Sequence, residues 1–401
     1  MSDNTASFSS LGLIEPLTRQ LETLGYNAPK GVQQVSVPAL LKGCDVKVKA
    51  NTGSGKTAAF ALPLLQRLYM TPPAGRGRKV RALVLSPSRE LAMQVGESIR
   101  SYGALLQPKL KVVTVFGGVS VNPQMIALRG GADILVATPG RLLDLISKNA
   151  VKLNQLETLI LDEADKLLSL GFSDELAKVF SLLPNQRQTA LFSATFGDEV
   201  SALASKVLRQ PLDIALEEST DKADIEQRVF EVAQERKTQL LINLIKQHDW
   251  RQLLVFANAR QTCNRLQQKL QRAGIKTQVF HGDKSQGNRV SVLNDFRQGK
   301  LQILIATDIA ARGLDIDKLP AVVNYELPRS PADYVHRIGR TGRAGESGQA
   351  ISLICPDEFH HFRVIEKKHK LRLQREQFPG FELPAAATNV SKDKKTPPQK
   401  G

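Results

Sequence analysis

Short apolar runs recur along the chain, and most are followed by a longer stretch with helical periodicity. The runs are rich in Val, Ile and Leu and nearly continuous, which is typical of parallel strands covered on both faces. In the first half they lie at 45–50, 80–86, 111–115, 133–137, 156–161 and 188–192, with amphipathic stretches at 89–106 and 197–208. A strand followed by a helix, repeated, predicts a doubly wound α/β sheet.

The pattern breaks at Gln210-Pro211 and then starts again. Residues 211–226 are polar and acidic, and we interpret them as a linker. Beyond it, strands are predicted at 252–257, 276–280, 301–306, 321–325 and 349–355, and helices at 259–273 and 285–298. The second half therefore predicts another domain of the same class, although no sequence repeat relates it to the first.

These breaks define the expected domain organisation. A chain of 401 residues is too long for one ordinary core, which favours two domains. The predicted parts are an N-terminal flank at 1–26, a domain at 27–210, the linker at 211–226, a second domain at 227–378 and a tail at 379–401. The tail is rich in Pro, Ala and Lys with little apolar content, so we expect it to be disordered.

One predicted strand departs from the pattern. Lys47 and Lys49 alternate with Val46 and Val48, although a strand that leads into a glycine-rich loop is expected to be buried on both faces. The sequence offers no physical account of these lysines.

Charge and cysteine content narrow the class of protein. Lys and Arg total 55 against 39 for Asp and Glu, a net charge of +16, which indicates a polyanionic partner such as nucleic acid or else only a solubilising surface. At 5% aromatic residues, base stacking is not expected to dominate. Three scattered cysteines form no metal-spaced pair and fit a reducing cytoplasm. No apolar run of about 18 residues exists, so no membrane helix is expected.

A glycine-rich loop from Ala50 to Thr57 predicts a phosphate site. Gly53 and Gly55 allow a tight turn that aims backbone N–H groups at phosphate oxygens, within a loop that also includes Thr52 and Ser54. Lys56 would reach the β- and γ-phosphates and Thr57 would bind Mg²⁺. A chance glycine-rich turn is the alternative, but the loop follows a strand and precedes a helix, as a phosphate loop must.

An acidic run, Asp162-Glu163-Ala164-Asp165, follows the apolar run at 156–161. Carboxylates just beyond a parallel strand lie where α/β sheets bind ligands. Asp162 would hold Mg²⁺, and Glu163 would orient and deprotonate an attacking water. The alternative is an acidic helix N-terminus, which is common in proteins.

Together with other runs in order, these motifs resemble those of the DEAD-box ATP-dependent RNA helicases of superfamily two. The resemblance extends from about residue 8 to residue 354. Besides the two motifs above, it rests on Phe8, Tyr26-Asn27-Ala28-Pro29, Gln33, Pro87-Ser88-Arg89-Glu90-Leu91-Ala92, Gly117-Gly118, Thr138-Pro139-Gly140-Arg141, Ser193-Ala194-Thr195, Val255-Phe256-Ala257-Asn258, Gln286 with Arg289, the run from Ala306 to Asp315 and the run from His336 to Arg343. It implies two RecA-like domains that use ATP and Mg²⁺.

The resemblance also assigns residues around the nucleotide. Gln33 would pair with the adenine edge and Phe8 would stack on its ring. Asp315 would approach the ribose, while Arg340 and Arg343 would supply charge to the γ-phosphate. The chain departs from the family at Lys30, where Thr or Ser is usual and its hydroxyl helps to link Gln33 to the phosphate loop.

RNA contacts are implied in the same way. Ser88, Arg89, Gly118, Thr138 and Arg141 in the first domain, and Arg289 and Thr307 in the second, would hold the RNA backbone, which carries little sequence information. Taken singly, the three arginines could equally be surface ion-pair partners. Ser193, Thr195, Asp165 and His336 would couple the ATP state to the RNA state.

The resemblance therefore implies RNA-stimulated ATP hydrolysis coupled to local, non-processive unwinding of short RNA duplexes, or to remodelling of ribonucleoproteins. A non-unwinding, ATP-gated RNA clamp and a superfamily-two DNA helicase are the alternatives. The sequence at 280–287 most resembles that of bacterial RhlE proteins. Ribosomal precursors or RNA-decay enzymes are the partners that the family resemblance implies. The basic segment at 360–375 predicts weak, non-specific RNA attachment.

Overall fold

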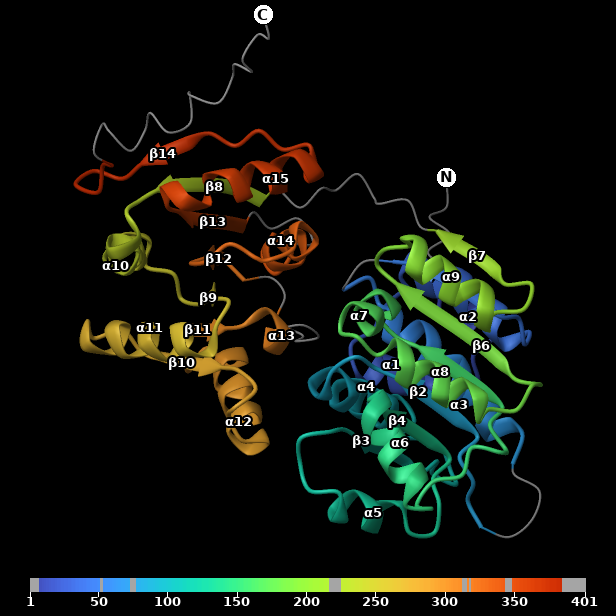
Figure 1. The fold of residues 1–401 in the computed structure, drawn as a ribbon. Helices are drawn as coiled ribbons and strands as arrows, with labels where there is room; N and C mark the ends of the chain where they lie inside the picture. Colours follow the sequence, from blue (N-terminus) through green and yellow to red (C-terminus); the bar gives the residue numbers. More distant parts are fainter. Residues whose placement is uncertain are drawn as a thin grey trace, which may run out of the picture. The chain divides into compact units, whose positions relative to one another are not determined.

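The chain folds into two compact units, Met1–Glu217 and Glu218–Gly401 (Figure 1). A computed structural model describes residues 7–50, 53–72, 77–215, 225–311, 316, 319–342 and 348–383. Each unit is built around its own parallel sheet, with helices on both faces. The predicted class, two doubly wound α/β domains, is confirmed.

The first unit contains a seven-stranded sheet in the order β3-β4-β2-β5-β6-β1-β7. All its pairings are parallel. The strands are β1 (Val46–Lys49), β2 (Ala82–Leu85), β3 (Val112–Val115), β4 (Ile134–Ala137), β5 (Thr158–Leu161), β6 (Gln188–Ser193) and β7 (Leu212–Ala215). The helices are α1 (Glu15–Thr23), α2 (Gly31–Leu41), α3 (Lys56–Met70), α4 (Arg89–Tyr102), α5 (Asn122–Leu128), α6 (Pro139–Ser147), α7 (Ala164–Ser169), α8 (Ser173–Ser181) and α9 (Asp198–Val207), with a 3-10 turn, η1 (Ser9–Leu11).

Alternate residues of the central strands enter two different cores. In β2, Val84 packs with apolar residues of α1 to α4, whereas Leu83 packs with those of α5 to α9. Both side chains are fully buried. Because successive residues of a strand point to opposite faces, burial on both faces requires the continuous apolar runs seen in the sequence.

The lysines of β1 are explained by the position of that strand. β1 lies second from the edge, between β6 and the edge strand β7. Lys47 is half-buried, pairs with Asp213 of β7 at 3.1 Å and lies 5.2 Å from the ring centre of Phe196, and Lys49 is exposed. One face of this strand is therefore only partly covered. The strand β7 occupies residues 212–215, which the sequence pattern assigned to the linker.

The second unit repeats this topology. Its sheet has the order β10-β11-β9-β12-β13-β8-β14, which is the order of the first sheet when its strands are counted from β8. The strands are β8 (Ile225–Glu231), β9 (Leu253–Phe256), β10 (Thr277–Phe280), β11 (Ile303–Ala306), β12 (Ala321–Asn324), β13 (Gly348–Ile354) and β14 (Arg375–Gln377). The helices are α10 (Lys237–His248), α11 (Arg260–Arg272), α12 (Gln286–Arg297), α13 (Asp308–Ala311), α14 (Pro331–Ile338) and α15 (Phe359–His369), with 3-10 turns η2 (Gln234–Arg236) and η3 (Pro356–Glu358).

The predicted tail begins later than the sequence indicated. Phe381 is 5% exposed, and its ring lies 5.8 Å from that of Phe378 and 4.4 Å from the guanidinium of Arg236. The prediction of disorder is therefore wrong for residues 379–383, because Phe381 completes the core of this unit. Residues 384–401 lie outside the described part of the chain. In the parts that are described, no helix has the length and apolar content needed to cross a membrane.

Candidate nucleotide site and nucleic-acid interface

The predicted site residues of the first unit lie in two groups along the carboxyl edge of its sheet. The glycine-rich loop follows β1, the acidic run follows β5, and Ser193-Ala194-Thr195 begins at the end of β6, and these three strands are neighbours. The predicted RNA-contacting residues follow β2, β3 and β4, which are the other three neighbours. Since parallel strands end at one edge, the strand order alone brings each group together.

The glycine-rich loop fits a phosphate group. Gly53 and Gly55 have φ values of 78° and 92°, in the left-handed region that favours glycine. Lys56 begins α3 and is 8% exposed, and its ammonium donates to the Ala50 carbonyl at 2.8 Å. The Ser54 hydroxyl is buried and has no hydrogen-bond partner among the described residues. Thr57 is half-buried on the first turn of α3, and Thr52 lies outside the described residues.

Electrostatics distinguish this loop from an ordinary turn. Burial lowers the pKa of Lys56, although Glu163 and Asp162 act in the opposite direction. Burial, together with the neighbouring Glu163, raises the pKa of Asp162 to about 7. A buried lysine beside two buried carboxylates is the kind of arrangement that marks functional sites.

The two carboxylates are held by different means. Glu163 is buried with φ 51°, a strained conformation for a residue that is not glycine, and its carboxylate pairs with the Lys166 ammonium at 2.7 Å. Within the described ranges no group of three or more His, Cys, Asp or Glu side chains is placed so that it could hold a metal ion by itself. Asp162 with the Thr57 hydroxyl fits Mg²⁺ nevertheless, because this ion is usually held by one or two carboxylates together with substrate phosphates and water.

Three of the four predicted coupling residues lie together. The Asp165 carboxylate accepts from the backbone N–H of Thr195 at 3.2 Å and from its hydroxyl at 3.1 Å. The Ser193 hydroxyl accepts from the Asp165 N–H at 3.3 Å and donates to the Thr195 carbonyl at 2.7 Å. Direct hydrogen bonds therefore link the acidic run to the end of β6.

Of the two predicted adenine-reading residues, Gln33 contacts the phosphate loop directly and Phe8 lies in the core. Gln33 is 1% exposed, and its amide accepts from the Lys30 N–H at 2.8 Å and donates to the Gly55 carbonyl at 3.1 Å. Phe8 is 6% exposed and packs in the core of the first unit, so most of its ring is covered by protein. Stacking of Phe8 on a base stays a prediction.

The predicted RNA-contacting residues of the first unit also converge. Ser88 caps α4 through the Leu91 N–H, and the Arg89 guanidinium donates to the Gly118 carbonyl at 3.4 Å. Thr138 accepts from the Gly117 N–H at 3.3 Å. Arg141 donates to the Val119 carbonyl at 2.7 Å, and one of its terminal nitrogens is buried without a partner among the described residues. These residues surround the loop at 117–119, at the ends of β2, β3 and β4, and Thr138 is buried.

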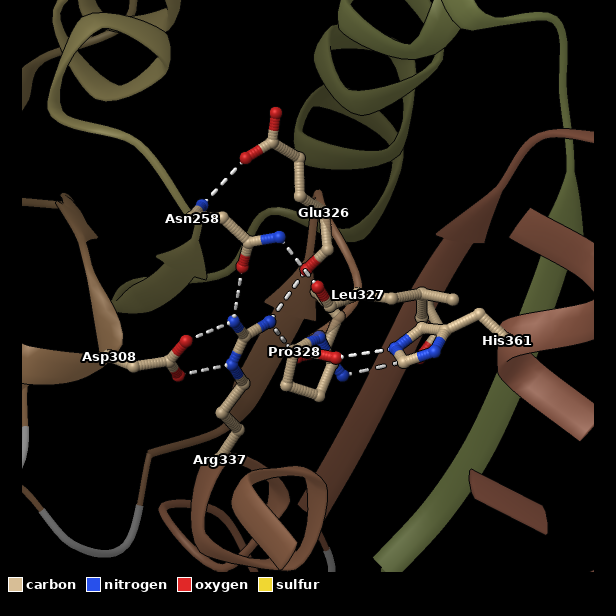
Figure 2. Close-up of polar contacts among 9 residues, drawn as sticks. Asn258, Asp308, Glu326, Leu327, Pro328, Arg337 and His361 are labelled. Atoms are coloured by element: carbon tan, nitrogen blue, oxygen red, sulfur yellow. Dashed lines mark hydrogen bonds and ion pairs between the residues drawn. The ribbon is translucent and has the colours of Figure 1, made fainter. Parts of the chain in front are cut away.

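In the second unit, one buried arginine joins three predicted motifs. Arg337, on α14, is 1% exposed and forms a paired interaction with Asp308 at 2.5 and 2.6 Å (Figure 2). It also donates to Asn324 at 3.1 Å, to the Glu326 carbonyl at 2.6 Å and to Asn258 at 2.9 Å. Asn258, Asp308 and Asn324 lie at or just beyond the ends of the adjacent strands β9, β11 and β12.

This network supports the segment that carries Arg340. The Arg340 N–H donates to the Arg337 carbonyl at 3.2 Å, and the Arg340 carbonyl accepts from Leu319 at 3.0 Å. Arg340 itself is 4% exposed. Thr307 and Arg289 are also buried, with Arg289 stacked 4.5 Å from the ring centre of Phe280. His336 is half-buried on α14, while Asp315 and Arg343 lie outside the described residues.

Comparison with known proteins identifies the family. Residues 30–203 match the DEAD/DEAH box helicase family, and residues 236–345 match the helicase conserved C-terminal domain. The chain is 41% identical to the ATP-dependent RNA helicase DbpA of Escherichia coli, over 93% of this chain and 81% of that protein. It is 38% identical to the ATP-dependent RNA helicase DeaD of Mycobacterium tuberculosis, over 94% of this chain and 66% of that longer protein. The chain belongs to the DEAD-box family of ATP-dependent RNA helicases.

Solved structures of DEAD-box proteins agree with this assignment. The Saccharomyces cerevisiae protein Dbp5, bound to RNA and ADP BeF3, matches with a TM-score of 0.80 at 31% identity, over 92% of this chain and 95% of that one. A DEAD-box protein from the hyperthermophile Methanococcus jannaschii matches at 36% identity and a TM-score of 0.52, over 92% and 99% of the two chains. Both units of this chain therefore have counterparts in solved DEAD-box proteins.

The second DEAD-box unit has no phosphate loop at the position equivalent to that of the first. After β8, the chain reads Val232 to Thr238 without a glycine and enters α10 at Lys237-Thr238, where the first unit has Lys56-Thr57. Lys237 is fully buried and pairs with Glu358 and the Tyr325 carbonyl. With its ammonium paired and no glycine turn before it, this position lacks the features of a phosphate loop.

The sequence did not assign a role to several residues that contact the predicted site residues. Lys166 pairs with Glu163 and is signalled only by its place three residues after Glu163. Arg337 stands inside the arginine run but was given no role of its own. Lys30 was noted only as a departure from the family pattern, whereas its ammonium donates to the Gly53 carbonyl at 2.8 Å.

Proposed function

We propose that this chain hydrolyses ATP in response to RNA and uses the hydrolysis to separate short RNA duplexes or remodel ribonucleoproteins. The proposal is carried by the arrangement of two groups of predicted site residues along the carboxyl edge of the first sheet. The residues predicted to bind nucleotide follow β1, β5 and β6, and those predicted to contact RNA in this unit follow β2, β3 and β4. Hydrolysis and RNA contact would thus share one rigid support.

The nucleotide roles follow from the local chemistry. The backbone N–H groups of Gly53, Ser54 and Gly55 would cradle phosphate oxygens together with Thr52, and Lys56 would neutralise their charge. Gln33 would read the adenine, with Phe8 beside it. Thr57 and Asp162 would hold Mg²⁺, which supplies positive charge to the phosphates when bound. Glu163, oriented by Lys166 at 2.7 Å, would accept the proton of the attacking water.

The second unit would complete the reaction. Arg340 and Arg343 would stabilise charge at the γ-phosphate, and Asp315 would contact the ribose. A catalytic arginine of this kind contributes roughly 10³ to 10⁵ in rate, so hydrolysis should be slow whenever it is withdrawn. Support comes from Arg337, which fixes the segment on which Arg340 lies. His336, Ser193, Thr195 and Asp165 would couple this step to RNA.

RNA would bind through its backbone. Ser88, Arg89, Gly118, Thr138 and Arg141 form a surface of hydroxyl, amide and guanidinium donors, and Arg289 and Thr307 would contribute from the second unit. The structural likeness to Dbp5 bound to RNA supports this role. Ribosomal precursors or RNA-decay enzymes in the cytoplasm are the proposed partners, and an RhlE-like enzyme is the proposed subtype.

The decisive test is Glu163→Gln. The amide keeps the size of the carboxylate but cannot accept the proton, so nucleotide and RNA binding should persist while hydrolysis falls by at least about 100-fold. RNA-stimulated phosphate release and mant-ATP titration measure the two properties. Hydrolysis at the parental rate would remove Glu163 from the proposed role.

Two further variants separate binding from chemistry. Lys56→Ala should lose nucleotide affinity, because the loop then lacks its buried cation. Arg340→Ala should keep nucleotide affinity and lose RNA-stimulated hydrolysis. A strand-separation assay with a short RNA duplex distinguishes an unwinding enzyme from an ATP-gated clamp, since a clamp hydrolyses ATP without releasing the strand.

A further inference from the structure

Lys30 occupies a position that the stability of its own helix does not explain. It is the N-cap residue of α2, where Ser, Thr, Asp or Asn normally accepts a hydrogen bond from the first turn. An ammonium cannot accept, and its positive charge lies at the positive end of the helix dipole. Two local preferences therefore act against lysine here, which indicates a role outside the helix.

The side chain of Lys30 crosses to the phosphate loop. Its ammonium donates to the Gly53 carbonyl at 2.8 Å, between residues 23 positions apart. Its stem lies over Gly55, because a Cβ built on that glycine would lie 3.2 Å from Lys30 Cδ. The same Cβ would lie 2.5 Å from the Gln33 amide nitrogen. Lys30 and Gln33 together thus cover the turn of the loop.

The charge of Lys30 remains available to a ligand. An ammonium has three N–H donors, and the Gly53 carbonyl takes one of them. Lys30 is exposed, unlike Lys56, whose buried ammonium faces Asp162 and Glu163. The loop therefore has one cation inside and a second on its outer side, beside the backbone that would hold phosphate.

We propose that Lys30 is a further phosphate-binding residue of the nucleotide site, which holds a positive charge against the outer side of the loop. This inference rests on the proposed function, because it requires that the loop bind a nucleoside triphosphate. Its contribution is electrostatic and grows with the number of phosphates on the nucleotide. Gln33, in contrast, contacts the base and contributes equally to all adenine nucleotides.

The test is Lys30→Met, which keeps the length of the stem over Gly55 and removes the charge. Titration with mant-ATP, mant-ADP and mant-AMP at fixed Mg²⁺ and moderate salt gives the three affinities. We expect ATP affinity to fall roughly three- to tenfold, as for one partly screened charge contact, ADP affinity to fall less and AMP affinity to be unchanged. Lys30→Arg should retain most of the ATP affinity.

Lys42→Met is the matched control. Lys42 lies at the other end of α2 and is exposed, so its loss changes net charge equally without affecting the loop. Equal loss for ATP and AMP would show that Lys30 only positions the loop, and unchanged ATP affinity would exclude any role. The melting temperature of Lys30→Met should not fall below that of the parent. Absence of ATP binding by the parent chain would overturn the proposed function itself, and with it this inference.

Discussion

Arg337 is a buried side chain that holds several segments of the second unit together through hydrogen bonds. Its guanidinium has five N–H donors, and all five are used, on Asp308, Asn324, Asn258 and the Glu326 carbonyl. Lysine could supply the charge but not the planar fork. Arg337 is therefore a positioning residue for the segment of Arg340.

Arg337→Lys tests this role. The variant leaves several buried acceptors without donors, so we expect a loss of about 2–4 kcal/mol in the unfolding free energy of the second unit. RNA-stimulated hydrolysis should fall, while mant-ATP affinity, a property of the first unit, should persist. Urea denaturation and titration measure the two effects.

Arg260→Lys is the control for Arg337→Lys. Its pair with Asp283 is about 60% exposed on both sides, and such pairs contribute little. A similar stability loss in both variants would contradict the special status of Arg337.

Asp162 allows a prediction about stability and pH. Its pKa is raised to about 7 in the folded protein by burial and by Glu163, against roughly 3.9 in an unfolded chain. The folded state then binds more protons, so this group destabilises the fold increasingly as pH rises from about 4 to about 7. Asp162→Asn should raise the melting temperature of the nucleotide-free, metal-free protein more at pH 8 than at pH 5. An equal gain at both pH values would contradict the raised pKa.

At the scale of elements, the loop after β3 is shaped by its contact with α4. Gly118 has φ 75°, and a Cβ built there would lie 2.2 Å from the Arg89 guanidinium. The first residue of α4 thus packs directly on the backbone of a loop from another strand. The positive φ of Gly118 disfavours a larger residue, and the close contact means that a larger residue would also displace the Arg89 guanidinium.

Gly118→Ala should therefore displace Arg89 and strain the loop. We expect RNA affinity to fall by about tenfold, the effect of one lost guanidinium contact of roughly 1.4 kcal/mol, with little change in nucleotide affinity. Fluorescence anisotropy with a short single-stranded RNA measures it. Gly117→Ala adds a methyl group that meets nothing within 4 Å, so its effect should be smaller. Equal losses in both variants would argue against the contact with Arg89.

At the scale of the whole molecule, two units with the same strand order carry different chemistry. The first has glycines and a buried lysine at the start of α3, and the second pairs the equivalent Lys237 with Glu358. In the proposed function, one unit would hold the triphosphate and the other would supply the arginines. We therefore expect nucleotide binding and RNA-stimulated hydrolysis to be separable by dividing the chain.

A fragment of residues 1–217, which corresponds to the first compact unit, provides that test. It should bind mant-ATP with near-parental affinity but show no increase in hydrolysis on addition of RNA, because Arg340 and Arg343 are missing. Phosphate release with and without RNA measures the difference. RNA-stimulated hydrolysis by the fragment at the parental rate would contradict the division of roles.

The pattern of apolar runs was sufficient for the class of fold and for most strands, because burial on both faces leaves a continuous signal in each segment. The phosphate loop and the acidic run could be proposed from their own residues, because their chemistry depends on residues close together in sequence. The sequence did not predict the strands β7, β8 and β14. The strands β7 and β14 lie at the edges of their sheets, where their side chains are only partly covered, and β8 mixes polar and apolar residues.

Contacts between residues that are far apart in the sequence were decided only by the tertiary structure. Strand order brings the ends of β1, β5 and β6 together and makes β1 nearly an edge strand, which explains Lys47 through Asp213. Only the structure shows the contact of Lys30 with Gly55, the hydrogen bonds that Arg337 makes to several strand ends, and the shared strand order of the two sheets. A linear pattern records which residues are buried or polar. Which of them meet is set by how strands order themselves in a sheet, and that order arises from packing of the whole unit.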